Sequence, residues 1–222
     1  MDLAVFDFTD ARNRMVDSQV RPNKVTDPRI IAAMRELPRE LFLPARLRPL
    51  AYIDEDIPLG GGRVLMEPMV IARLVQLLAP TAGERALVLA AGVGYGAALL
   101  AACGVRVTAL EDDQSLLALA RPALESTAAS VSLVVGPLAA GWPAGAPYDF
   151  ILLEGSVSQI PPVLGRQLRA DGGRLVTVIS ASGTLGQAVL AEPTPVGFSA
   201  QPVFDCATPA IPSLLPRPGF VF

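Results

Sequence analysis

The stretch RALVLAAGVGYGAALLAACGVRVTALEDD, residues 85–113, decides the fold of this 222-residue chain. It contains two short apolar runs, residues 86–90 and 105–110, separated by a glycine cluster and a helical run at residues 97–102. Short apolar runs that alternate with helical runs are typical of βα units, whose parallel strands are buried on both faces. The stretch therefore predicts two neighbouring strands of a parallel sheet.

The same alternation continues towards the C-terminus. Further apolar runs predict strands at residues 131–135, 150–153, 174–179, 187–190 and 201–204, with helices at 114–125 and 160–168. Before residue 85 the chain is more charged, and its spacing predicts helices at 10–20, from Asp27-Pro28 onward, and at 67–78, with a turn or single helical turn at 38–44. We expect Thr9 or Asp10 to cap the first of these helices.

Composition excludes several classes of enzyme. The chain has no histidine, which excludes a Ser-His-Asp triad, a Cys-His pair and most zinc hydrolases, and its two cysteines cannot form a zinc site, so we expect no metal. The net charge of −3, with no basic stripe, argues against a nucleic-acid partner. No membrane segment and no signal peptide are evident, and the cysteine usage gives no disulfide framework, so we expect a cytoplasmic protein without a membrane partner.

The predicted topology places a ligand site at the carboxyl ends of the strands. Those ends are residues 90–94, 111–113, 136–138 and 154–155. The glycines at 92–96 allow a ligand to approach the backbone at a helix N-terminus, and a carboxylate at Glu111 can accept both ribose hydroxyls of an adenosine cofactor. A dinucleotide and S-adenosylmethionine both satisfy this geometry.

A series of short motifs follows in an order that matches one known family. They are Met15-Val16-x-x-Gln19-Val20-Arg21, Asp27-Pro28-Arg29, Ala33-Met34, Pro38-Arg39-Glu40-x-Phe42-x-Pro44, Tyr52, Asp56-Ile57-Pro58-Leu59-Gly60, Gly92-Val93-Gly94-Tyr95, Gly141-Trp142-Pro143 and Ala146-Pro147-Tyr148-Asp149-x-Ile151. Over residues 11–180 the chain resembles the protein-L-isoaspartate O-methyltransferases, a branch of the class I S-adenosylmethionine-dependent methyltransferases.

The resemblance implies a fold and an activity. The fold is a Rossmann-like three-layer α/β/α sandwich, with a mostly parallel seven-stranded sheet and a C-terminal antiparallel strand. Residues 1–80 form a helical extension with the active-site loop, and residues 81–222 form the cofactor-binding domain, together one compact unit. The activity is methylation of the carboxylate of isoaspartyl residues in damaged proteins or peptides, with S-adenosylmethionine as cofactor.

The resemblance and the strand ends together give the candidate site. The cofactor-binding residues are Ala90, Ala91, Gly92, Val93, Gly94, Tyr95, Glu111, Asp112, Pro137, Leu138 and Glu154. The candidate catalytic residues are Arg63 and Glu67.

Three departures from the family pattern alter this expectation. The family's active-site loop carries hydroxyl residues in a Thr-x-Ser-Gln-Pro-like segment, whereas residues 64–68 here read Val-Leu-Met-Glu-Pro. The acid expected before the glycine motif is absent, since Val88 and Ala90 stand there, and Pro137 replaces an acid that meets the adenine. We therefore expect Arg63 to orient the acceptor carboxylate through its guanidinium fork, and Leu138 or Glu154 to supply polar contacts to the cofactor.

Two other functions fit the same fold. A non-catalytic homologue with weak or no cofactor binding would act as a binding or interaction protein, and the missing hydroxyls suit it. A nicotinamide-dependent oxidoreductase would need a proton donor that this chain, without histidine, does not obviously supply. The proline-rich tail (Pro209, Pro212, Pro216, Pro218) either covers the active-site loop, binds a partner or follows the surface, and a surface position is the expectation.

Overall fold

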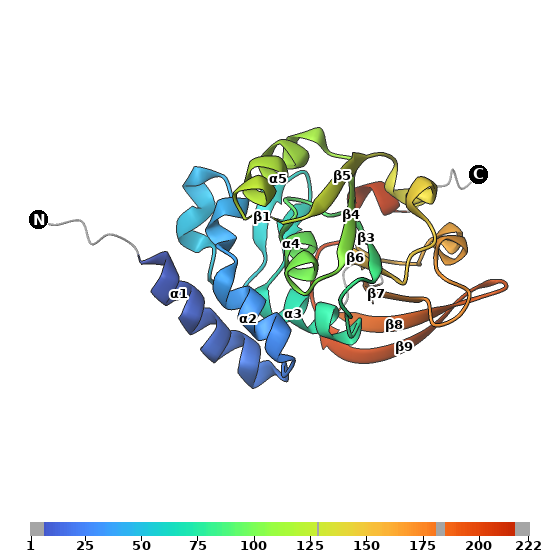
Figure 1. The fold of residues 1–222 in the computed structure, drawn as a ribbon, viewed down its shortest axis with the longest axis horizontal. Coiled ribbons are helices and arrows are strands. Elements are labelled where there is room, and N and C mark those ends of the chain that lie inside the picture. Colours follow the sequence, from blue (N-terminus) through green and yellow to red (C-terminus); the bar gives the residue numbers. More distant parts are fainter. Residues whose placement is uncertain (1–6, 128, 181–184, 216–222) are drawn as a thin grey trace, which may run out of the picture.

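A seven-stranded sheet forms the centre of the structure (Figure 1). This computed structural model describes residues 7–127, 129–180 and 185–215. The strand order is β5-β4-β3-β6-β7-β8-β9, with parallel pairing from β5 to β7 and antiparallel pairing of β8 with both neighbours. The predicted Rossmann-like sandwich is confirmed, and its antiparallel edge is a pair of strands.

The elements have the following bounds. The strands are β1 (Ile57–Gly60), β2 (Arg63–Leu65), β3 (Arg85–Leu89), β4 (Arg106–Glu111), β5 (Val131–Val135), β6 (Phe150–Val157), β7 (Arg174–Ile179), β8 (Gly186–Thr194) and β9 (Gly197–Cys206). The α-helices are α1 (Phe8–Met15), α2 (Pro28–Glu36), α3 (Pro68–Leu77), α4 (Tyr95–Ala102) and α5 (Gln114–Ser126). The 3₁₀ helices are η2 (Arg21–Asn23), η3 (Arg39–Phe42), η4 (Ala45–Leu50), η5 (Leu138–Ala140), η6 (Pro143–Gly145), η7 (Pro162–Gln167) and η8 (Pro212–Leu214), and η1 (Val16–Val20) is a π-helical turn.

The two faces of the sheet carry different covers. Alternate strand residues such as Val88 and Leu152 pack into one core with side chains from α3, α4 and α5. Their neighbours, such as Leu89 and Leu153, pack into a second core under η5 and η7. Both cores are apolar, which explains why β3 and β6 read as continuous apolar runs in the sequence.

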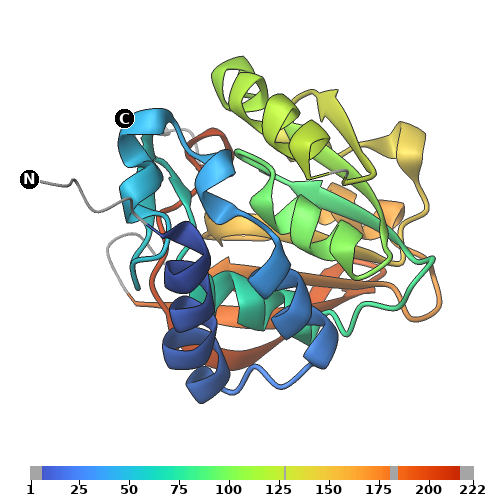
Figure 2. The same cartoon turned by 60° about the vertical axis from the view of Figure 1, so that its left-hand side comes forward.

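The N-terminal helices extend the first core. Figure 2 shows α1 and α2, in blue, beside α3 and α4, and side chains of α1 and α2 such as Met15 and Ile30 belong to the same core. Asp27 caps α2 by accepting from the Arg29 amide (2.9 Å), as the sequence predicts. The first helix starts earlier than expected, because the Asp7 carboxylate caps it by accepting from the amides of Thr9 and Asp10.

The helix predicted at residues 160–168 is wrong in type. The segment forms the 3₁₀ helix η7, which starts late, after Pro161. It also ends early, because Leu168 is extended and forms a β-bridge with Tyr148. Only six residues remain between these limits, too few to nucleate a stable α-helix.

A small hairpin, β1–β2, stands apart from the main sheet and carries part of the predicted active-site loop. Its turn consists of Gly60, Gly61 and Gly62, all with positive φ. A left-handed turn of this kind is open to glycine at little steric cost. The hairpin places Arg63 at the start of β2, facing the main sheet.

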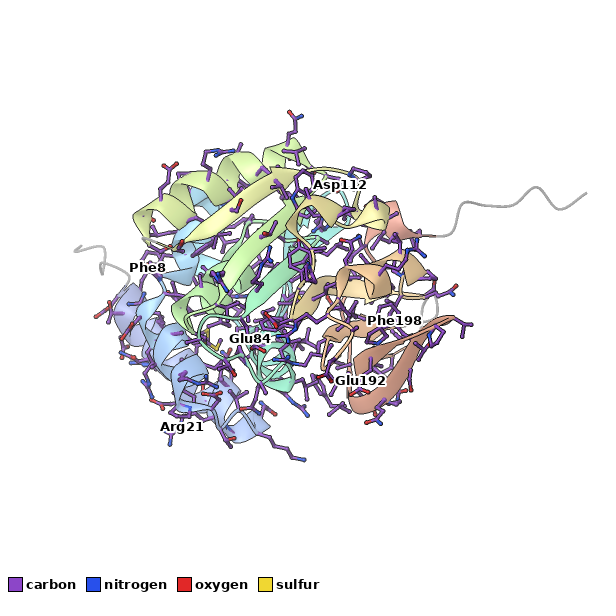
Figure 3. The ribbon with its side chains drawn as sticks, turned by 45° about the vertical axis from the view of Figure 1, so that its right-hand side comes forward. Phe8, Arg21, Glu84, Asp112, Glu192 and Phe198 are labelled. Atoms are coloured by element: carbon purple, nitrogen blue, oxygen red, sulfur yellow. The ribbon has the colours of Figure 1, made fainter. Side chains whose placement is uncertain are left out.

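The carboxyl and amino ends of the central strands lie at opposite ends of the molecule. Figure 3 labels Asp112, which follows β4, and Glu84, which precedes β3, at opposite ends of these parallel strands. In the part of the chain that the structure describes, no helix combines the length and apolar character needed to cross a membrane. The predicted absence of a signal peptide concerns an N-terminus whose first six residues lie outside the described part.

Candidate active site

The turn between β3 and α4 is the first part of the candidate site. Ala90, Gly92 and Gly94 all have positive φ, at 59°, 56° and 88°. Gly94 precedes the first residue of α4, and a Cβ atom there would come within 3.2 Å of Leu124 on α5. Ala90 adopts the same left-handed region without being glycine, at a cost of about 1–2 kcal/mol. The turn is therefore held in a conformation that suits close approach of a ligand to the backbone.

Glu111 forms the second part, at the end of β4. Its side chain is fully buried. Oε2 accepts a hydrogen bond from the Gly92 amide (2.7 Å), and Oε1 accepts from the amides of Asp112 (3.0 Å) and Asp113 (3.1 Å). The carboxylate thus joins the glycine turn to the end of β4, where the sequence places it.

Arg63, on the β1–β2 hairpin, provides the remaining hydrogen bonds to Glu111. Its Nη1 donates to Glu111 Oε1 (2.8 Å) and its Nη2 donates to Glu111 Oε2 (2.9 Å), a bidentate ion pair. Nη2 also donates to the Ala90 carbonyl (2.7 Å), and Nη1 lies 3.9 Å from the partly exposed carboxylate of Asp112. Arg63 is 8% exposed, so this pair is shielded from water.

This geometry gives Arg63 a different partner from the one expected. We predicted that its fork would bind the carboxylate of an acceptor, and the fork does bind a carboxylate in two-point fashion. The carboxylate belongs to the protein, at the position predicted to bind a ribose. The role of Arg63 towards an acceptor stays a prediction.

Glu154, near the middle of β6, faces the start of α4. A Cβ atom on Gly96 would lie 2.2 Å from Glu154 Oε1, so the missing side chain at Gly96 makes room for this carboxyl. Among the described residues none donates a hydrogen bond to that buried oxygen. Burial raises the pKa of Glu154 to about 8, the positive charge of Arg63 opposes this shift, and the negative charge of Glu111 adds to it.

The predicted adenine position lies on the other core. Leu138 is buried in the second apolar cluster, at the start of η5, whereas Pro137 is exposed. Glu154 therefore faces α4 and does not lie beside Leu138, which separates two residues that we expected to contact the same part of the cofactor. Their contacts to a cofactor stay predictions.

The segment after β9 closes the site from the C-terminal side. Ser156 and Ala210 form a parallel bridge, and a Cβ atom on Gly155 would come within 2.6 Å of Ile211, which is buried. Pro209 and Pro212 are exposed while Ile211 between them is buried, so the described part of the tail follows the surface at the carboxyl end of the sheet, in keeping with the expected surface position. Pro216 and Pro218 lie outside the described residues.

A small cavity marks where these parts meet. It is lined by Gly62, Arg63, Val64, Glu154, Gly155, Pro209, Ala210 and Ile211. Val64 stands where the family has a hydroxyl residue, so the cavity wall is apolar where the family pattern is polar. Sequence reasoning missed the 209–211 wall, although the proline-rich stretch was a signal that this segment is rigid.

Glu67, the second candidate catalytic residue, has different surroundings. It precedes α3, and its amide donates to Asp56 Oδ1 (2.7 Å). Partial burial and the nearby carboxylates of Asp54, Asp56 and Glu55 raise the pKa of the Glu67 carboxyl. The loop before α3 is thus acidic at this point, which disfavours a second negative charge.

Tyr95 does not face the ligand side of the turn. Its ring makes an edge-on contact with Phe42, with centroids 5.4 Å apart, and the guanidinium of Arg39 lies 4.7 Å from its centroid. Tyr95 therefore connects the glycine turn to the N-terminal helices. The contact of Tyr95 with a cofactor stays a prediction.

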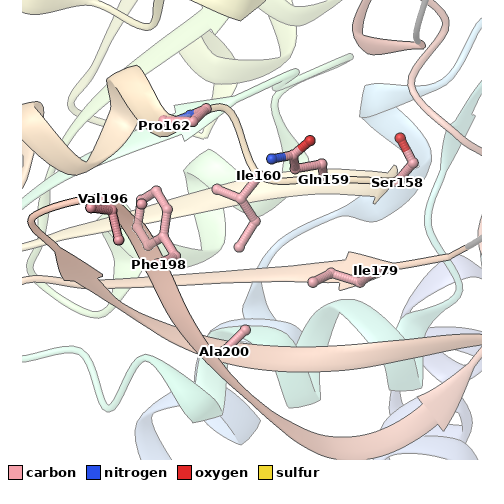
Figure 4. Close-up of a pocket in the computed structure, with 9 residues that line it drawn as sticks. Ser158, Gln159, Ile160, Pro162, Ile179, Val196, Phe198 and Ala200 are labelled. Atoms are coloured by element: carbon pink, nitrogen blue, oxygen red, sulfur yellow. The ribbon is translucent and has the colours of Figure 1, made fainter.

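A second cavity lies elsewhere, between the segment after β6 and the β8–β9 hairpin (Figure 4). Its volume is about 280 Å³, and its lining includes Ile160, Ile179, Phe198 and the polar residues Ser158 and Gln159. None of the predicted site residues lines it. The chemistry that the sequence predicts is gathered at β3, β4 and β6 instead.

Comparisons with known proteins show which family this chain is similar to. A family model described as protein-L-isoaspartate(D-aspartate) O-methyltransferase matches residues 10–191. A protein-L-isoaspartate O-methyltransferase of Methylorubrum populi is 40% identical over 180 residues, 81% of this chain and 84% of the relative. A protein of the same name from Rhodopseudomonas palustris, numbered 1, is 41% identical over 175 residues, 78% of this chain and 71% of the relative.

Solved structures support the fold. A protein-L-isoaspartate O-methyltransferase structure matches with a TM-score of 0.76 at 22% identity, covering 93% of this chain and 67% of that chain. A Plasmodium falciparum structure of the same family, in complex with S-adenosyl-L-homocysteine, matches with a TM-score of 0.73 at 17% identity and covers 89% of this chain and 96% of that chain. At these identities the likeness supports the fold alone.

Proposed function

The chain belongs to the protein-L-isoaspartate(D-aspartate) O-methyltransferase family, and we propose that it methylates the carboxylate of isoaspartyl residues in damaged proteins or peptides. Family membership confirms the predicted enzyme class, an O-methyltransferase that depends on S-adenosylmethionine. The observation that carries the proposal is the position of Glu111, at the end of β4 beside the glycine turn, in a chain that matches the family over residues 10–191.

The residues of the turn fit the cofactor. Gly92 leaves the backbone beside Glu111 without a side chain, Gly94 allows α4 to begin against Leu124 of α5, and the first turn of α4 presents the N-terminus of an eight-residue helix. Glu111 carries two oxygens that suit the two hydroxyls of a ribose. We assign the ribose to Glu111, the backbone contacts to residues 92–94, and the adenine to the stretch around Leu138. In this structure Arg63 is hydrogen-bonded to both oxygens of Glu111, so a ribose can bind there only if Arg63 moves away.

The reaction asks little of the protein's acids and bases. When bound, S-adenosylmethionine supplies a methyl group that its sulfonium already activates for transfer. An isoaspartyl carboxylate is ionised at neutral pH and needs no general base, so a chain without histidine can do this chemistry. What remains for the protein is alignment of the two reactants and exclusion of water. The buried surroundings of Arg63 and Glu111 suit the second task.

The acceptor side departs most from the family. Val64 and Met66 stand where the family carries hydroxyls, and the pKa of the nearby Glu67 carboxyl is raised by burial and by neighbouring acids. In the acidic environment of this loop, an acceptor with flanking basic residues would bind better than an acidic one. We place the protein in the cytoplasm, a location in keeping with its two buried cysteines, both of them free thiols.

Two measurements test the proposal. Calorimetric titration with S-adenosylhomocysteine tests the cofactor, and transfer of a tritiated methyl group to an isoaspartyl peptide tests the acceptor, with the aspartyl peptide of the same sequence as control. We expect binding, and label only on the isoaspartyl peptide. Binding without transfer would reject the acceptor, and a lack of binding at millimolar ligand would reject the cofactor.

A further inference from the structure

We propose that Arg63 is an internal competitor for the ribose position of the cofactor site, so that S-adenosylmethionine binds only after the β1–β2 hairpin withdraws this side chain from Glu111. The inference rests on the proposed function, because it assumes that Glu111 receives the ribose. It concerns the state of the protein before the cofactor arrives.

The first argument is the match of donor geometry. Arg63 gives one N–H to each oxygen of Glu111, at 2.8 and 2.9 Å. The two neighbouring hydroxyls of a ribose would give one O–H to each of the same oxygens. The guanidinium fork therefore occupies the donor positions that the ribose needs.

The second argument is that the carboxylate has no spare capacity. Oε1 accepts from Arg63 and from the amides of Asp112 and Asp113, and Oε2 accepts from Arg63 and the Gly92 amide. A carboxylate offers about four lone-pair positions in total, and five donors already share them. The ribose can bind only in place of one of these donors, and Arg63 is the side chain among them.

The third argument concerns the glycine turn. Arg63 Nη2 donates to the Ala90 carbonyl and lies 3.8 Å from the position of a Cβ atom on Gly92. The guanidinium thus also covers the face of the turn that a missing side chain leaves open. Arg63 blocks two predicted contacts of the cofactor, the ribose acid and the backbone beside it.

The structure allows Arg63 to leave at moderate cost. Removing one partner of a buried ion pair normally strands a charge. Here Glu111 keeps three backbone amide donors, from Gly92, Asp112 and Asp113, so its charge stays hydrogen-bonded. These amides hold the carboxylate ready for a second pair of donors.

The hairpin that carries Arg63 is suited to movement. Its strands have only four and three residues, and Ile57 and Leu65 anchor them in the first core, so the freedom to move lies in the turn and the residue that follows it. Its turn is Gly60, Gly61 and Gly62, immediately before Arg63. A Cβ atom on Gly62 would lie 3.0 Å from Pro212 Cγ, so withdrawal of the hairpin also changes its contact with the C-terminal segment.

The consequence is a reduced apparent affinity. A ligand that binds only the open state has its dissociation constant multiplied by the reciprocal of the open fraction. Removal of the guanidinium makes the site open at all times. We therefore expect Arg63→Met to bind S-adenosylhomocysteine at least tenfold more tightly than the wild type.

Calorimetric titration of full-length variants with S-adenosylhomocysteine tests this directly. Arg63→Met removes the fork and keeps an apolar side chain, whereas Arg63→Lys keeps the charge but cannot donate to both oxygens at once. We expect the affinity order Arg63→Met, then Arg63→Lys, then wild type. Arg48→Met is the matched control, because Arg48 contacts the Leu43 carbonyl away from Glu111, and it should bind as the wild type does.

The outcomes separate the competitor from the cofactor assignment. Wild-type binding with equal or weaker binding by Arg63→Met overturns the competitor and leaves the proposed function intact. A lack of binding by every variant overturns both, because removal of Arg63 would then have opened nothing. Arg63→Met combined with Glu111→Gln should lose the gained affinity, and a retained gain would show that Arg63 acts elsewhere. If Arg63→Met fails to fold by circular dichroism, Arg63→Lys decides the question.

Discussion

Two buried arginines, Arg39 and Arg63, have opposite kinds of partner. Arg39 is fully buried, its Nε donates to the Ala51 carbonyl (2.8 Å), its Nη2 donates to the Met66 carbonyl, and its guanidinium lies on the Tyr95 ring. Arg63 instead binds the carboxylate of Glu111 through both ends of its fork.

The difference teaches how to tell a structural buried charge from one that can be exchanged. Arg39 holds two backbone carbonyls, those of Ala51 and Met66, and so fastens the loop before α3 to the N-terminal part of the chain. Glu111 has three amide donors of its own and lies where a ligand is expected. The two arginine side chains are similarly buried, and the kind of hydrogen-bond partner distinguishes the structural one from the one that can be exchanged.

The largest effect should come from Arg39→Met. Two buried carbonyls would lose their donor, and each buried group left unsatisfied costs about 1–3 kcal/mol, so we expect the free energy of unfolding to fall by about 3–5 kcal/mol in total. Urea unfolding followed by circular dichroism measures this. Arg46→Met, at an exposed position, is the control and should change stability little. A loss of stability below about 1 kcal/mol for Arg39→Met would show that Arg39 is not a structural residue.

A smaller loss is expected from Arg63→Met, although it breaks an ion pair. Hydrogen bonds to a charged group contribute about 1.5–3 kcal/mol, and the three amides keep Glu111 satisfied, so the expected loss is about 1.5–3 kcal/mol in all. The same urea unfolding measurement applies. If Arg63→Met proves more destabilising than Arg39→Met, the guanidinium is a fixed structural part and not an exchangeable one.

The next effect is the pH dependence of stability that comes from Glu154, a buried carboxyl near Arg63. Its pKa in the folded protein, about 8, lies above its ordinary value of 4.5, so the folded state holds the proton more tightly and stability from this group is lost as pH rises from about 4.5 to 8. Between pH 5 and pH 8, Glu154→Gln should therefore lose less free energy of unfolding than the wild type, by an amount on the order of 3 kcal/mol.

Urea midpoints of wild type and Glu154→Gln at both pH values measure this difference. Glu125→Gln, at an exposed position on α5, is the control and should follow the wild type. If the stabilities of wild type and Glu154→Gln change with pH in the same way, the pKa of Glu154 is not raised in the folded protein.

The smallest effect concerns the aromatic contact beside Arg39. Phe42→Leu removes the edge-on contact with Tyr95 while it keeps an apolar side chain, and we expect a loss of about 1 kcal/mol. Thermal unfolding measures it, and the affinity for S-adenosylhomocysteine should not change. A large change in affinity would mean that Tyr95 transmits the N-terminal packing to the cofactor site.

Much of the central sheet could be predicted from local pattern. The bounds of β5 and β7 agree with the expected strands, and Glu111 ends β4 as expected, because apolar runs bounded by charges and glycines report strands that are buried on both faces. The helix at 160–168 failed because the bridge between Tyr148 and Leu168, a contact distant in sequence, ends η7 early.

The β1–β2 hairpin and the contacts of the tail could not be predicted from local pattern. The β1–β2 stretch combines proline, three glycines and an arginine without an alternating pattern, so no periodic signal marks it as a hairpin. The tail at 209–211 pairs with β6 through the bridge between Ser156 and Ala210, a contact distant in sequence. The contacts of the Tyr95 ring with Phe42 and Arg39 likewise join residues distant in sequence, which no local pattern reveals.

The sequence by itself determined the α/β sheet, the glycine turn at its carboxyl end and the acid that faces this turn, because each depends on residues close together in the chain. Only the tertiary structure decided what the acid binds. Arg63 and Glu111 are 48 residues apart, and their pairing depends on where the hairpin rests on the sheet. A guanidinium and a ribose offer a carboxylate the same two donors, so residue types alone could not show which of them Glu111 holds.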